Sequence, residues 1–124
     1  MVEYNNALVK TQELRDQINT LNQRMRIKWT LLNSTYLVIR TVGKMIKQNE
    51  KDLRIAKSRN NTTKMVVFQT KMDFHSLIVR VCVQHAKNLR GVMRQDQNVI
   101  SKLKTEMMGH FKKSQQIFRD LNPG

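Results

Sequence analysis

Three side chains that can bind metals or act as nucleophiles lie close together in the sequence: His75, Cys82 and His85. Cys82 and His85 are three positions apart, so on a helix they would share a face and could reach one ligand. A structural zinc ion needs four ligands and a catalytic one needs three plus water. Asp73 and His110 are the nearest residues that could complete the set, but neither stands at a recognised spacing. We therefore interpret His75 and Cys82 as residues of a helix contact and His85 as solvated, and we predict no metal site.

Signatures of other enzyme classes are also missing from the sequence. The glycines are far apart, at Gly43, Gly91, Gly109 and Gly124, so no glycine-rich loop is present to hold a phosphate. No paired carboxylates stand out among the nine acids. We therefore expect that the protein is not an enzyme, has no catalytic residues and needs no cofactor.

The charge of the chain is more informative than its catalytic side chains. The 124 residues include 23 Lys and Arg against 9 Asp and Glu, a formal net charge of +14. Residues 24–60 carry a net +8 and residues 61–95 a net +5, whereas residues 1–23 carry −1. A basic excess of this size favours an acidic partner: nucleic-acid phosphate or an acidic protein surface. An anionic membrane fits less well, because the widest apolar stretches resemble a protein core.

The basic residues of this central part recur at helical spacing. In the first half of the chain they follow steps of four and three, and in the second half they recur every seven residues. Outer positions of paired helices often carry charge for solubility, but ordinary surfaces mix both signs, and the first stripe contains no acid at its own positions. The predicted contacts to an acidic partner or phosphate are Arg40, Lys44, Lys47, Lys51, Arg54, Arg80, Lys87, Arg90 and Arg94.

Long helices must position these residues. From Tyr4 to Ala56, apolar residues recur at alternating steps of three and four, and only Lys28 and Asn49 are clearly polar exceptions. This period of 3.5 residues is typical of a seam between coiled helices. A polar stretch interrupts the pattern, which resumes at Met65 and continues to Leu121. The sequence predicts one all-helical domain, 1–124, with a first arm over about 3–57, a polar loop at 58–64 and a second arm over about 65–121.

Two all-α architectures fit this pattern. One is a long antiparallel helical hairpin that resembles a coiled coil. The other is an up-down four-helix bundle, in which each arm breaks once, near Asn33–Ser34 and near Gly91. We favour the hairpin, because the seam keeps its phase through both candidate breaks.

The middle of each arm is apolar well beyond the seam. A pair of helices hides only its seam, and exposed apolar patches of this size mark interfaces. We therefore expect self-association, most simply as a dimer. The predicted contact residues are Trp29, Leu37, Val38, Met45, Phe74, Ile78 and Val81.

Targeting signals are not evident. The first residues lack the basic and apolar regions of a signal peptide, and no apolar run approaches the ~18 residues of a membrane span. We expect an intracellular protein, cytoplasmic or nuclear. The hypothesis from sequence is a basic helical assembly or scaffold protein that binds itself and an acidic macromolecule. The alternative is a nucleic-acid-binding protein that contacts backbone phosphates without reading sequence.

Overall fold

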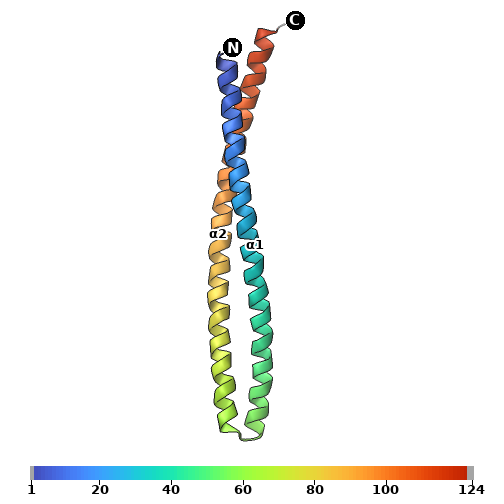
Figure 1. Cartoon of the computed structure of the whole chain (residues 1–124), viewed down its shortest axis with the longest axis vertical. Coiled ribbons are helices and arrows are strands. Elements are labelled where there is room, and N and C mark those ends of the chain that lie inside the picture. The colour runs from blue at the N-terminus through green and yellow to red at the C-terminus, as the bar shows by residue number, and fades with distance from the viewer. Residues whose placement is uncertain (1, 123–124) are drawn as a thin grey trace. The chain divides into compact units, whose positions relative to one another are not determined.

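The computed structural model describes residues 2–122, which form two helices, α1 (Val2–Ser58) and α2 (Thr62–Leu121) (Figure 1). The prediction of an all-helical chain is confirmed. Helix α1 continues through Asn33 and Ser34, and α2 continues through Gly91. The described residues therefore agree with the hairpin and lack the two helix breaks that a four-helix bundle within one chain requires.

The loop between the helices is shorter than the predicted 58–64, because only residues 59–61 lie outside a helix. Asn60 has a positive φ of 52°, a conformation that Asn tolerates. The amide of Asn61 donates to the carbonyl of Ala56 at 2.9 Å and satisfies the end of α1. The side-chain oxygen of Asn61 accepts from the amide of Lys64 at 3.1 Å. Asn61 thus caps α2, which begins three residues earlier than the predicted second arm.

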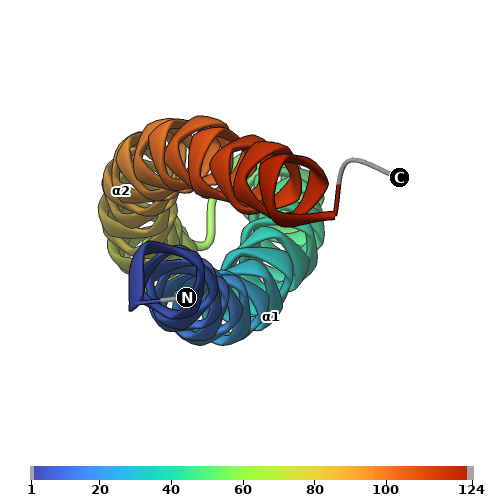
Figure 2. The same cartoon turned by 90° about the horizontal axis from the view of Figure 1, so that it is seen from above.

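Contacts within the chain define two units. Unit 2 is Trp29–Gly91 and contains the loop, whereas unit 1 combines the chain up to Lys28 with the chain from Val92 onward. Each unit contains one segment of α1 and one antiparallel segment of α2. Within each unit the two segments wind around each other (Figure 2), as a 3.5-residue seam requires.

Burial follows the predicted seam along both helices. In unit 1 the buried residues are Ala7, Thr11, Leu14, Ile18, Met93, Ile100 and Ser114. In unit 2 they are Leu32, Val42, Asn49, Leu53, Ala56 and Ala86. All other seam residues from Tyr4 to Ile117 are half-buried, and only Leu121, at the end of α2, is exposed. The repeat in the sequence therefore identified the helix contact residue by residue.

The two polar exceptions in the first arm each have a polar partner on the other helix. In unit 1, Lys28 Nζ donates to Asp96 Oδ2. In unit 2, Asn49 Nδ2 and His75 Nδ1 are 3.0 Å apart. A polar group inside a helix contact is tolerated when it is hydrogen-bonded, and such pairs specify the alignment of the helices. Each pair therefore fixes the register of its own unit.

Candidate interaction surfaces of unit 2

The side chains outside the seam of unit 2 divide between two opposite sides. In a heptad abcdefg with a and d in the seam, positions e and b flank one side of each helix and g and c flank the other. Tyr36 and Arg90, both at e, meet across the helices, where Arg90 Nη1 donates to Tyr36 Oη at 2.6 Å. Near the loop, Asp52, Ile55 and Lys64, all at g or c, line one hollow. Positions e and b of α1 and α2 therefore share one side, and positions g and c share the other.

The basic side of unit 2 lies at the e and b positions. Its basic residues are Arg40, Lys47, Arg54 and Lys57 from α1 and Arg80, Lys87 and Arg90 from α2, all of them exposed. The residues at b on each helix are seven positions apart, or about 10 Å along the helix. Two acids, Glu50 and Asp73, also lie at e and b positions of this unit. Basic residues nevertheless dominate the side.

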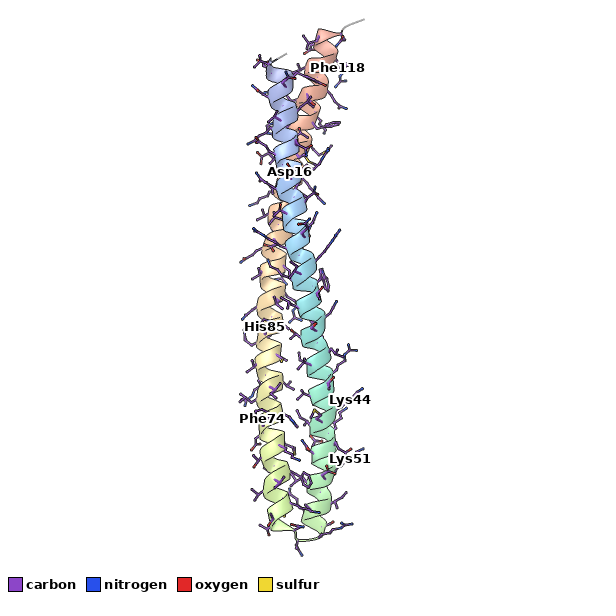
Figure 3. The ribbon with its side chains drawn as sticks, viewed as in Figure 1. Asp16, Lys44, Lys51, Phe74, His85 and Phe118 are labelled. Carbon is purple, nitrogen blue, oxygen red and sulfur yellow. The ribbon has the colours of Figure 1, made fainter. Side chains whose placement is uncertain are left out.

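Three of the predicted basic contacts lie elsewhere. Lys44 and Lys51 occupy f positions and extend from α1 away from α2 (Figure 3). Arg94 is exposed and belongs to unit 1. The stripe predicted along the first arm thus contains two sets of side chains, one on the basic side and one on the back of α1.

The apolar side of unit 2 lies at the g and c positions. It consists of Leu31, Val38, Met45 and Ile55 from α1 and Val67, Phe74, Ile78 and Val81 from α2. Ile78 is half-buried, and the other seven are between 42% and 60% exposed. Asp52, Lys64 and Lys71 occupy g positions near the loop, beside Ile55 and Val67. No Lys, Arg, Asp or Glu occupies a g or c position between residues 31 and 48 or between 74 and 88. The central part of this side therefore carries no permanent charge.

The residues predicted for self-association divide between surfaces. Val38, Met45, Phe74, Ile78 and Val81 all belong to the apolar side. Trp29 occupies an e position and Leu37 an f position, and both are exposed. Three members of the apolar side were not among the predicted contact residues: Leu31, Ile55 and Val67. Their g and c positions in the heptad were the signal that identifies them.

The residues considered for chemistry are separated by the heptad. His75 lies in the seam beside Asn49, and Cys82 is a half-buried seam residue with a free thiol. His85 is exposed at a g position on α2 (Figure 3). Among the described residues, no three or more His, Cys, Asp or Glu side chains gather closely enough to hold a metal ion.

Unit 1 contains an apolar hollow of its own. It is lined in part by Tyr4 and Leu8 from α1 and Phe111 and Phe118 from α2. The rings of Tyr4 and Phe118 are 6.1 Å apart between centroids and tilted by 39°. Ser114, a buried seam residue, also lines this hollow.

Comparisons and hydropathy place no further constraint on the function. Within residues 2–122, neither helix has a segment that is long and apolar enough to cross a membrane. Comparison of the chain with protein-family models, curated proteins and solved structures returned no match.

Proposed function

We propose that the protein is a non-enzymatic intracellular assembly protein that binds a second copy of itself and docks its basic side on an acidic macromolecule. One observation carries the proposal. Unit 2 holds 12 Lys and Arg against 3 Asp and Glu; seven of the basic residues lie at its e and b positions, whereas its g and c positions at 31–48 and 74–88 carry no charged residue. Opposite sides let one unit bind two different surfaces at the same time.

Nucleic acid is a second candidate for the acidic macromolecule, supported by the composition of the basic side. Arg40, Arg54, Arg80 and Arg90 present guanidinium groups, which bind phosphate through two parallel hydrogen bonds. The e positions add two aromatic side chains: Trp29, which is 52% exposed, and the half-buried Tyr36, whose hydroxyl accepts from Arg90. The guanidinium contacts would be to backbone phosphates, so binding through them would not depend on sequence.

A charge reversal tests the docking proposal. The variant Lys47→Glu, Arg54→Glu, Lys87→Glu changes the charge of the basic side by six units. The control variant Lys102→Glu, Lys104→Glu, Lys112→Glu makes the same change on exposed residues of unit 1. Exposed substitutions of this kind cost within about 0.5 kcal/mol each. Both variants should therefore melt close to the wild type.

The readout is fluorescence anisotropy with two probes, a random-sequence DNA duplex and polyglutamate, at low and moderate salt. We expect wild-type binding that weakens steeply as salt rises, because phosphate contacts release bound counterions. The basic-side variant should lose about tenfold or more in affinity, and the control much less. Duplex binding without polyglutamate binding would support the nucleic-acid candidate. Equal losses in both variants, or no binding of either probe at low salt, would contradict docking through the basic side.

A further inference from the structure

We propose that the apolar side of unit 2 is the contact between two copies of this chain, and that the resulting dimer carries its two basic sides on opposite outer surfaces. The inference deepens the proposed function and rests on it for the role of the basic sides. Its structural part, the choice of contact surface, stands on the distribution of apolar and charged residues alone.

The area and composition of the apolar side match a specific protein contact. Seven large apolar side chains that are each about half exposed present on the order of 600–700 Å² per copy, close to the roughly 800 Å² per partner of a standard interface. Val38 and Met45 follow one another at a seven-residue interval on α1, and so do Phe74 and Val81 on α2. This repeat lets a second pair of helices pack along the surface in the same way that the seam packs.

Charge identifies the second copy as the occupant. Unit 2 carries a net charge of +9, so two copies repel each other through most of their surface. The g and c positions at 31–48 and 74–88 carry no Lys or Arg. Two copies that meet at these positions therefore bring no Lys or Arg side chains together. His85 lies at one of these positions and is exposed. A two-fold pairing of identical surfaces therefore places apolar residues against apolar residues.

A bilayer is the competing occupant of the apolar side, because a helix that binds an anionic bilayer buries its apolar face in the lipid and carries Lys and Arg on its polar face. Light scattering without lipid distinguishes the two, since a chain that is monomeric there has no second copy on this side. A second copy uses both sides, because it covers the apolar residues and leaves the basic residues open.

Two neighbouring residues test the contact. Val38, at g, lies on the apolar side and is 42% exposed, and Leu37, at f, lies on the back of α1 and is 58% exposed. Light scattering should give the mass of two chains for the wild type and for Leu37→Glu, and the mass of one 14.7 kDa chain for Val38→Glu. A wild type that is monomeric at micromolar concentration, or a Val38→Glu variant that stays dimeric, would overturn the proposal.

A second measurement covers the case in which Val38→Glu fails to fold. If the copies associate, the melting temperature of the wild type rises with protein concentration, because binding to the folded state stabilises it by mass action. For the wild type and for Leu37→Glu, we expect the melting temperature to rise by several degrees when the protein concentration is raised about 100-fold from the micromolar range. A melting temperature that does not depend on concentration would contradict self-association.

The consequence for the basic sides is tested by bridging. An immobilised DNA duplex is loaded with protein and then offered a fluorescent duplex of the same random sequence. The wild type should retain the second duplex, whereas folded Val38→Glu should bind the immobilised duplex without retaining the second. A dimeric wild type that binds no duplex would contradict the nucleic-acid candidate and leave the dimer contact intact. A wild type that binds duplex but is monomeric would contradict the dimer contact and leave docking intact.

Discussion

Units 1 and 2 are built on the same helical repeat and differ in what surrounds it. Unit 1 carries 11 Lys and Arg against 6 Asp and Glu, whereas unit 2 carries 12 against 3. Two acids of unit 1 lie next to lysines: Lys10 and Glu13 approach to 3.8 Å, and Asp96 pairs with Lys28. Mixed charge of this kind is typical of a solvated surface. The contrast locates the candidate interactions in unit 2.

The units have similar numbers of buried residues, seven and six, but helix α2 contributes differently to them. In unit 1, helix α2 contributes Met93, Ile100 and Ser114 to the buried residues, whereas in unit 2 it contributes Ala86 alone. The remaining seam residues of α2 in unit 2 are half-buried, and apolar side chains next to them are exposed. A further partner would bury these half-buried seam residues and the exposed apolar side chains next to them. Unit 2 therefore combines the uncovered apolar surface with the unbalanced charge.

The strongest test of this comparison is a charge placed in the seam of unit 1. Ile100 is 1% exposed, and Ile100→Asp would bury an unpaired carboxylate, so we expect a loss of more than about 4 kcal/mol in the free energy of unfolding. Val99, the next residue on the same helix, is 45% exposed, and Val99→Asp should cost less than about 1 kcal/mol. Urea titrations followed by circular dichroism would measure both. Similar losses for the two variants would show that the seam does not hold unit 1 together.

A smaller effect is expected when one polar pair is broken. Asp96→Ala leaves Lys28 half-buried without its carboxylate, and we expect a loss of about 1–3 kcal/mol. The control is Asp73→Ala in unit 2. Asp73 is exposed, and its side chain accepts a hydrogen bond from Gln69 of the same helix at 2.9 Å. Its removal should lower the free energy of unfolding by no more than about 0.5 kcal/mol. The double variant Lys28→Leu, Asp96→Leu should recover the stability lost in Asp96→Ala, because both charges are removed. Thermal melts would distinguish these outcomes. Equal melting temperatures for Asp96→Ala and Asp73→Ala would contradict a role for the pair in stability.

The smallest expected effect is a gain of stability that should be the same in both units. A Cβ atom added at Gly43 of unit 2 or at Gly109 of unit 1 would meet nothing within 4 Å. Alanine costs less backbone entropy than glycine in a helix, so Gly43→Ala and Gly109→Ala should each raise the free energy of unfolding by about 0.5–1 kcal/mol. A loss at Gly43 alone, measured by urea titration at a concentration that favours dimers, would indicate that a second copy approaches α1 on the basic side, because Gly43 occupies an e position. That result would contradict the proposed dimer contact.

Sequence alone predicted the helices and their seam because both depend on local periodicity. Every residue between Tyr4 and Ile117 that keeps the 3.5-residue phase is buried wholly or in part, and so are a few residues beside the seam, such as Tyr36 and Ile78. The loop was predicted too long, because its length depends on one side-chain cap, at Asn61, that competes with neighbouring Thr residues for the same role.

The alignment of the two helices could not be predicted once the loop length was wrong. The pairing of Lys28 with Asp96 and of Asn49 with His75 depends on that alignment, so neither pair was predicted, although all four residues were placed in the seam. The division into a basic and an apolar side needs only heptad positions and was accessible from the sequence. The identity of the acidic partner was not, because a Lys or Arg side chain attracts phosphate and carboxylate alike.

The short loop at residues 59–61 has a consequence for the order in which the protein folds. The polar contacts between the helices join residues that are 26 apart for Asn49 and His75, 54 apart for Tyr36 and Arg90, and 68 apart for Lys28 and Asp96. The entropy lost in closing a chain segment grows with its length, by about 0.6 kcal/mol for each doubling. Contacts next to the loop therefore form first, and each one shortens the free segment that the next must close. We expect α1 and α2 to pair progressively from Asn60 outward, so that the charged, partly uncovered unit 2 is complete before the chain ends of unit 1 come together.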